Sequence, residues 1–187
     1  MRIKSGTRAS AANVWTAFDV RAILTERGWF GDDLNLDSDS SSSPAGKWVA
    51  DAAAWLGPYA ADCDALAALL SLVFRYDARE IIASSDAHAV LLRQGARDAI
   101  RALGVEVLDG SPIDSVRFSE IVAAVKQRSG VSGRPLFHSI RLALAGRAGE
   151  GELDRVILLL DTAAAAPGFA PVKTARERML EFCGVLD

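Results

Sequence analysis

The segment GRPLFHSIRLALAGRAGEGELDRVILLL, residues 133–160, decides the fold class of this chain. Its apolar residues recur at intervals of three and four on both sides of a glycine-rich stretch, as the buried faces of two helices do. Over residues 136–144 a strand is the alternative, because apolar residues also alternate there, but a helix accounts for more of the apolar positions. We therefore predict a helix that ends at Gly146 and a second helix over 153–160, joined by a tight corner.

Other segments along the chain show helical periodicity and the usual helix boundaries. Asp114 or Ser115 provides a cap for the segment 111–130, and Thr174 with Glu177 forms a capping box at the start of the last helix. Because alanine and leucine are abundant while tyrosine and β-branched residues are sparse, we expect an all-α protein, a helical bundle. Besides the corner pair, the predicted helices are 11–27, 47–56, 62–76, 88–104, 111–130 and 174–184.

Glycines mark some of the expected helix boundaries. Gly104 and Gly184 are expected to close two of the helices. Gly95 lies inside the predicted helix 88–104, where it costs about 1 kcal/mol relative to alanine. The segment 62–76 is the most apolar of the chain, and we predict that it forms the central core helix.

Composition divides the chain into three predicted parts. Residues 31–46 combine acidic, serine, proline and glycine residues, and this composition predicts a solvated loop that contributes little to a core. We therefore predict an N-terminal helix plus this acidic, serine-rich loop over residues 1–46. A first helical subdomain follows over 47–110, and a second one, which carries the corner, covers 111–187.

The overall charge excludes a general attraction to polyanions. The chain has 21 Lys and Arg residues against 24 Asp and Glu residues, a net charge of -3, so contact with nucleic acid would have to come from a local patch. One such patch lies between residues 126 and 155, where six basic residues against three acidic ones leave a local charge of +3. Its basic residues are Lys126, Arg128, Arg134, Arg141, Arg147 and Arg155.

Catalytic, metal and cofactor chemistry is not expected from these residues. Cys63 and Cys183 are far apart and form no zinc pattern with the histidines, so we expect reduced thiols packed as small hydrophobic residues. His138 lies away from the apolar stripe of its helix, which predicts an exposed side chain. Since there is no glycine-rich phosphate loop, no signal core and no apolar run of membrane-spanning length, we expect no cofactor and a cytoplasmic protein.

The segment VKQRSGVSGRPLFHSIRLALAGRAGEGELD, residues 125–154, resembles the C-terminal anticodon-binding region of bacterial glutamyl-tRNA synthetase. The pattern of that family is approximately G-K-x-L-F-x-P-[IL]-R-x-A-L-T-G-R-x-x-G-P-E-L. A weaker similarity upstream extends the resemblance over residues 60–183. The positions that match in unbroken register are Leu136, Phe137, Ile140, Arg141, Ala143, Leu144, Gly146, Arg147, Glu152 and Leu153.

The resemblance implies a helical cage that holds the anticodon stem-loop of a tRNA, and hence a stand-alone tRNA-binding protein with a role in translation. Because the chain lacks the catalytic nucleotide-binding domain of a synthetase, we expect no aminoacylation by the chain itself. In that family the arginine matched by Arg141 faces the anticodon, and a guanidinium can stack on an unpaired base. The expected RNA-binding residues are Arg134, His138, Arg141, Arg147, Glu150, Gly151 and Leu153.

Three departures from the family pattern affect the shape of the corner. Ser139 and Gly151 stand where the family has proline, and Ala145 stands where it has threonine. Glu150 also adds a negative charge close to where RNA would approach. These changes put sequence-specific reading of an anticodon in question even where the fold is kept.

Three alternatives stay open at this point. In the first, Arg141 forms an ion pair with Glu150 or Glu152 and only closes the corner. In the second, the helical domain binds a protein partner rather than RNA, which predicts an exposed apolar patch or a dimer interface in place of a basic groove. In the third, the chain is a segment of a longer synthetase.

Overall fold

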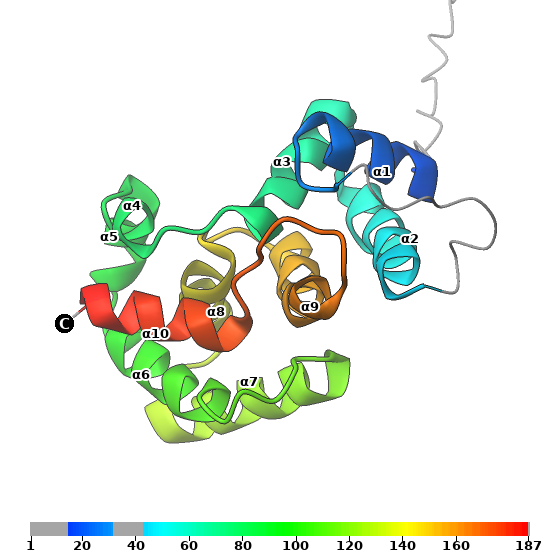
Figure 1. Ribbon diagram of the computed structural model, residues 1–187. Coiled ribbons are helices and arrows are strands. Elements are labelled where there is room, and N and C mark those ends of the chain that lie inside the picture. Colours follow the sequence, from blue (N-terminus) through cyan, green and yellow to red (C-terminus); the bar gives the residue numbers. More distant parts are fainter. Residues whose placement is uncertain (1–14, 32–42, 187) are drawn as a thin grey trace, which may run out of the picture.

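The computed structural model describes residues 15–31 and 43–186. Within these two ranges it contains ten α-helices and no β-strand, which confirms the predicted all-α fold class (Figure 1). The helices are α1 (Ala17–Glu26), α2 (Pro44–Leu56), α3 (Cys63–Phe74), α4 (Ala78–Ile82), α5 (Ser85–Leu91), α6 (Ala96–Val107), α7 (Ser115–Ser129), α8 (Arg134–Ala145), α9 (Gly151–Ala165) and α10 (Ala175–Leu186), and the short 3-10 helix η2 (Gly57–Tyr59) follows α2.

The helices form two groups that share one hydrophobic core. In Figure 1, α1, α2 and α3 lie together at one end, α4, α5, α6 and α10 lie toward the other end, and α8 and α9 lie between them. α9 packs against α2 and α3 as well as against α8. A helix of the predicted second subdomain therefore shares its core with helices of the predicted first one, and the division at residues 46 and 110 stays a prediction.

Several predicted boundaries are confirmed in atomic detail. Oδ1 of Asp114 accepts a hydrogen bond from the backbone N–H of Arg117 at 2.8 Å, which makes Asp114 the N-cap of α7. Glu177 accepts a hydrogen bond from the backbone N–H of Thr174 at 2.8 Å, and Thr174 accepts one from the backbone N–H of Glu177 at 3.2 Å, so the capping box is formed. Gly146, with φ +79°, closes α8.

Three glycine positions and one cysteine differ from the prediction. Gly95 has φ +79° and separates α5 from α6, because the left-handed conformation interrupts a helix. Gly104 and Gly184 lie inside α6 and α10 rather than at their ends. Gly104 faces α10, where an added Cβ would make an ordinary van der Waals contact of 3.7 Å with Sγ of Cys183. Cys183 packs against the core, but Cys63 is exposed, contrary to the prediction.

The first two helices begin at side-chain caps. α1 begins later than predicted because Thr16 caps it, and the predicted helical residues 11–14 lie outside the described part of the chain. α2 begins earlier than predicted because Ser43 caps it, and residues 32–42 of the predicted loop also lie outside the description. None of the described helices combines the length and the hydrophobicity needed to cross a bilayer.

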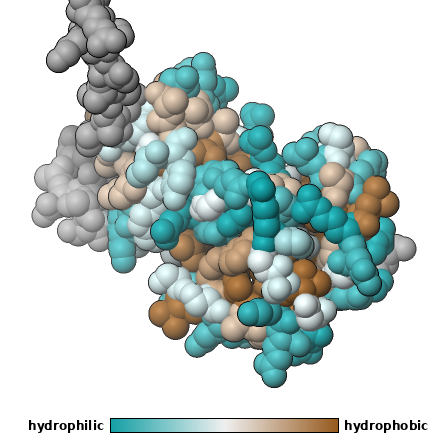
Figure 2. All heavy atoms as spheres, turned by 180° about the vertical axis from the view of Figure 1, so that it is seen from behind, coloured by the Kyte–Doolittle hydropathy of each residue, from teal (hydrophilic) through white to brown (hydrophobic). Residues whose placement is uncertain are grey.

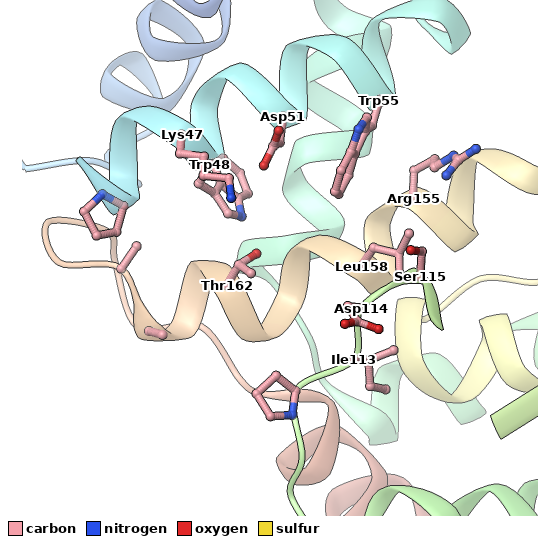
Figure 3. Close-up of a pocket in the computed structure, with 14 residues that line it drawn as sticks. Lys47, Trp48, Asp51, Trp55, Ile113, Asp114, Ser115, Arg155, Leu158 and Thr162 are labelled. Atoms are coloured by element: carbon pink, nitrogen blue, oxygen red, sulfur yellow. The ribbon is translucent and has the colours of Figure 1, made fainter. Parts of the chain in front are cut away.

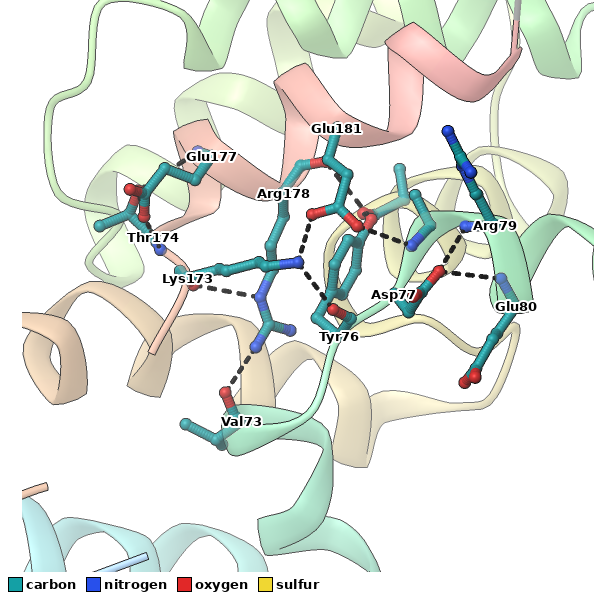
Figure 4. A network of polar contacts seen from close by, with 12 residues as sticks. Val73, Tyr76, Asp77, Arg79, Glu80, Lys173, Thr174, Glu177, Arg178 and Glu181 are labelled. Atoms are coloured by element: carbon teal, nitrogen blue, oxygen red, sulfur yellow. Dashed lines mark hydrogen bonds and ion pairs between the residues drawn. The ribbon is translucent and has the colours of Figure 1, made fainter. Parts of the chain in front are cut away.

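A buried arginine joins three helices in the middle of the fold. Arg178 on α10 is 0 % exposed, and Figure 4 shows its contacts with Val73 and Lys173. Its Nε donates a hydrogen bond to the carbonyl oxygen of Lys173 at 3.1 Å, and its two Nη atoms donate to three further backbone carbonyl oxygens. Two of them, Leu72 at 2.9 Å and Val73 at 2.6 Å, lie in the last turn of α3, and the third, Leu144 at 2.8 Å, lies in the last turn of α8. Carbonyls in these positions have no partner inside their own helix. Arg178 therefore closes the C-terminal ends of two helices from a third one.

Tyr76 supports this arrangement from the segment between α3 and α4. Its ring centroid lies 4.7 Å from the guanidinium carbon of Arg178, and its hydroxyl donates a hydrogen bond to the carbonyl oxygen of Ala143 in α8. Burial lowers the pKa of Arg178 to about 10, while Tyr76, Asp161 and Glu181 oppose this shift, so the side chain is still charged at neutral pH. A positive charge at two helix C-termini also interacts favourably with both helix dipoles.

We predict that Arg178→Met destabilises the protein by at least about 3 kcal/mol, because it leaves four backbone carbonyl groups, all at least partly buried, without their donor. Urea unfolding followed by tryptophan fluorescence measures this loss. Arg176→Met is the matched control on the same helix, since Arg176 is exposed and its side chain donates one hydrogen bond, to Leu108. We expect the control to lose less than about 1 kcal/mol. Equal losses in the two variants would contradict the role given to Arg178.

Candidate nucleic-acid interface

The predicted corner between α8 and α9 is closed by Arg141. Its Nε and Nη2 donate to the two carboxylate oxygens of Asp154, both at 2.7 Å, and its Nη1 donates to the carbonyl oxygen of Gly149 at 2.9 Å. At Gly149 an added Cβ would lie 2.8 Å from both Glu152 Oε1 and Leu153 Cδ1, so these side chains would have to shift to admit a larger residue. The arginine thus joins the end of α8, the corner backbone and the first turn of α9.

Arg141 is turned into the protein rather than toward solvent. The residue is 7 % exposed, and its guanidinium carbon lies 5.1 Å from the ring centroid of Phe137. Burial alone would lower the pKa of Arg141, but the hydrogen bonds and the charge of Asp154 raise it above its usual value. This is the alternative in which Arg141 closes the corner, with Asp154 as the acidic partner in place of Glu150 or Glu152. A direct contact of Arg141 with RNA stays a prediction.

His138 differs from the prediction, because it is buried and not exposed. The residue is 7 % exposed, since α5 packs against α8 and the loop after α5 brings Arg93 against the ring. Nη1 of Arg93 lies 3.0 Å from Nδ1 of His138, and Nε of Arg134 lies 3.3 Å from Nε2. Burial, Arg93 and Arg134 lower the pKa of His138, and Glu150 only partly opposes them. The imidazole is therefore neutral at pH 7.

The other predicted RNA-binding residues lie in different environments. Arg134 forms an exposed ion pair with Glu150 across the corner, with 70 % and 61 % of the two side chains exposed. Arg147 is exposed, and its side chain has no hydrogen bond or ion pair to the described residues. Leu153 is 2 % exposed and belongs to the core, which leaves it no surface for a base. Gly151 is half-buried and faces a surface hollow.

A groove with a volume of about 800 Å³ lies between α2 and α9 (Figure 3). Its walls are one face of each helix, because the lining side chains recur every three or four residues. The loop 112–115 before α7 forms a third wall. The residues that give the groove its chemical character are Lys47, Asp51 and Trp55 from α2 and Arg155, Leu158 and Thr162 from α9.

The groove combines an aromatic surface with both signs of charge. Trp55 is half-buried and presents part of its ring to the hollow, whereas Lys47 and Arg155 are exposed. Among the described residues, neither cation has a side-chain hydrogen bond or ion pair. Asp51 and Asp114 supply two carboxylates, so the groove is not a basic one. The groove can therefore bind an aromatic ring next to an anionic group, and its carboxylates can accept hydrogen bonds from a ligand.

A second, smaller hollow of about 290 Å³ continues from the groove to the corner. The two hollows share Ser115, Arg155 and Leu158, and the smaller one ends at Gly151. Its aromatic lining comes from Tyr59, which is 50 % exposed, and from Phe118. Arg155 therefore lies where the two hollows meet, between Trp55 on one side and Tyr59 with Phe118 on the other. We call the two hollows together the α9 groove.

Two buried contacts hold the walls of the α9 groove in place. The indole N–H of Trp48 donates to the carbonyl oxygen of Leu159 at 2.9 Å, which fixes α2 against α9. The carboxylate of Asp161 on α9 accepts hydrogen bonds from the backbone N–H groups of Ile113 and Ala175, both at 2.9 Å. This second contact fixes the loop before α7 and the start of α10 to the same helix.

Sequence reasoning placed the site at the corner and missed most of the α9 groove. The sequence marks Arg155 only as one charge of the basic patch, and Trp55, Tyr59 and Phe118 are not among the predicted RNA-binding residues. The spacing of Lys47, Asp51 and Trp55 shows that they share a helix face. Nothing in the sequence, however, shows that α9 packs beside that face.

Neither comparison with known proteins nor a metal-binding cluster identifies the nature of the site. No family model, curated protein or solved structure matches the chain. Within the described ranges, no group of three or more His, Cys, Asp or Glu side chains is arranged to hold a metal ion.

We predict strong energetic coupling between Arg141 and Asp154. Arg141→Gln and Asp154→Asn should each cost about 2 kcal/mol or more, because each leaves a largely buried charge without its partner. The double variant should lose clearly less than the sum, by about 1–3 kcal/mol. A double-mutant cycle in urea measures this, and the exposed pair Arg134 and Glu150 is the control, with an expected coupling below about 1 kcal/mol. Similar coupling in both pairs would contradict the prediction.

We also predict that His138 makes the protein sensitive to weak acid. Its pKa is lowered in the folded state, so the unfolded chain binds the proton first as the pH falls through about 6.5, and the free energy of unfolding decreases there. Unfolding free energies at about pH 7.5 and 5.5 measure this dependence. His138→Gln should remove part of it, and His88→Gln should keep it. The prediction fails if both variants behave like the wild type.

Proposed function

We propose that this protein binds RNA and that the α9 groove receives unpaired nucleotides, such as those of a tRNA anticodon loop. The observation that supports the proposal is the position of Arg155, an exposed cation without a described partner that lies between the aromatic side chains of the two hollows. The groove also begins at Gly151, in the corner that resembles an anticodon-binding surface. The expected setting is translation in the cytoplasm, without aminoacylation by the chain itself.

The chemistry of the groove suits single-stranded RNA better than a duplex. Each unpaired base has two flat faces, and stacking on an aromatic side chain contributes about 1–3 kcal/mol per base. Trp55, Tyr59 and Phe118 are spaced along the groove for such contacts. Arg155 can pair with a phosphate between them or stack on a base itself. A paired duplex buries its base faces and would gain none of this stacking.

The carboxylates of the groove limit its attraction for phosphate but suit the edges of bases. A carboxylate accepts hydrogen bonds from the amino group of cytosine, and Asp51 and Asp114 line the groove. With Lys47 and Arg155 as the only basic residues among its lining side chains, we expect few phosphate contacts and a moderate dependence on salt. Base stacking would then supply most of the affinity.

A second candidate function is the binding of a protein partner. It is favoured by the mixed charge of the groove and by the apolar surface that Figure 2 shows among hydrophilic side chains on the face seen there. Large apolar side chains such as Phe18 and Leu92 are 79 % and 87 % exposed. If the groove serves a protein partner, groove variants will leave RNA affinity unchanged.

We expect the wild-type protein to bind total tRNA and an anticodon stem-loop at about 50 mM salt, with weaker binding at about 200 mM. Arg155→Ala and Trp55→Ala should each weaken binding by about tenfold, which corresponds to the loss of one stacking or phosphate contact. Fluorescence anisotropy of labelled RNA measures the affinity. Quenching of tryptophan fluorescence that disappears in Trp55→Ala would locate a base on that ring.

Arg79→Ala is the control, because Arg79 is an exposed arginine on α4, at the opposite end of the molecule from α2 (Figure 1). It should change the affinity by less than about twofold, since exposed charges far from an interface contribute little. A duplex RNA of equal length should bind more weakly than the stem-loop. If no RNA binds at either salt concentration, the proposed function is wrong.

A further inference from the structure

The neutral imidazole of His138 cannot accept hydrogen bonds from both of the arginines that contact it. Arg93 and Arg134 each direct a guanidinium N–H at one ring nitrogen, at 3.0 Å and 3.3 Å. A neutral imidazole has one nitrogen that accepts and one that carries a hydrogen. One of the two arginines therefore has a donor that faces another donor. Protonation of the ring would make this worse, because both nitrogens would then be donors.

The surroundings of this cluster favour an anion. Arg93 and Arg134 are exposed, and their guanidinium groups lie on either side of one imidazole ring, each within hydrogen-bond distance of one ring nitrogen. Arg134 is also the first residue of α8, whose N-terminus has no side-chain cap, so the helix dipole adds a partial positive charge there. Glu150 is the carboxylate that contacts the cluster, through Arg134. Arg141 carries a further positive charge, but Asp154 neutralises it.

We propose that Arg93 and Arg134, held apart by His138, form a phosphate subsite that binds one backbone phosphate of the RNA strand. This inference rests on the proposed function. Guanidinium groups hold phosphate oxygens with paired N–H donors. A bound phosphate would accept a hydrogen bond from the arginine N–H that the imidazole cannot satisfy. It would also replace Glu150 as the partner of Arg134. His138 is a positioning residue, because its buried ring sets the separation of the two guanidinium groups.

The subsite is connected to the α9 groove through Glu150 and Gly151. Arg134 pairs with Glu150, and the next residue, Gly151, lines the end of the groove at the corner. A strand whose bases lie in the groove would therefore carry a phosphate past the corner toward Arg93 and Arg134. Glu150 pairs with Arg134 at this position.

The imidazole resonances of the two histidines provide a direct test, because the chain has only His88 and His138. We would follow them by NMR as a function of pH, in inorganic phosphate and in chloride at the same ionic strength. An anion against Arg93 and Arg134 should raise the pKa of His138 by about 1 or more and leave His88 unchanged. Arg93→Gln should abolish this response, with circular dichroism to verify that the variant is folded. An identical titration of His138 in both salts would overturn the subsite.

Binding of the stem-loop RNA distinguishes the source of the phosphate. If a backbone phosphate occupies the subsite, Arg93→Gln should reduce the slope of log Kd against log salt by about 1. An unchanged slope, together with a phosphate response of His138, would assign the subsite to a free phosphate and overturn its role in RNA binding. If the wild type binds no RNA while His138 still responds to phosphate, the proposed function fails and the assignment of the subsite to RNA fails with it.

Discussion

The guanidinium of Arg178 is the contact on which the arrangement of the helices depends. A helix leaves the carbonyl groups of its last turn without partners, and burying them without donors is costly. In this protein α3 and α8 both end inside the fold, and a single side chain of α10 donates to the last turn of each. Tyr76 adds a donor to a neighbouring carbonyl of α8. The two helix ends can be buried together only because a charged, multiply donating side chain lies between them.

Three arginines of this fold differ in role, and the extent of their burial distinguishes the structural ones from the accessible one. Arg178 is fully buried and bonded to backbone carbonyls, and Arg141 is almost fully buried and paired with Asp154 at the corner. Both are committed to structure. Arg155 is exposed, has no partner among the described residues and faces a groove. The availability of its donors, rather than its place in a motif, makes it the better candidate for binding a ligand.

The geometry of the corner and the α9 groove keeps RNA binding as the proposed function but changes the residues proposed to contact the RNA. The residues of the predicted site that remain accessible are Arg134, Arg147, Glu150 and Gly151. They border the corner, whereas the aromatic side chains that could stack on bases lie farther along α9. The proposed RNA contact therefore moves from the inward-facing Arg141 to the groove that starts beside it. The balanced charge of the groove makes stacking, rather than phosphate attraction, its main chemical feature.

The sequence by itself determined the all-α class, most helix positions and the capping residues Asp114 and Thr174, because these depend on periodicity and on hydrogen bonds between near neighbours. It also placed the corner after Gly146. Only the tertiary structure decided the burial of His138 and the choice of Asp154 as the partner of Arg141. The same holds for the groove, whose two walls come from α2 and α9. These features depend on which helices pack together, and distances between residues far apart in the chain leave no periodic signal in the sequence.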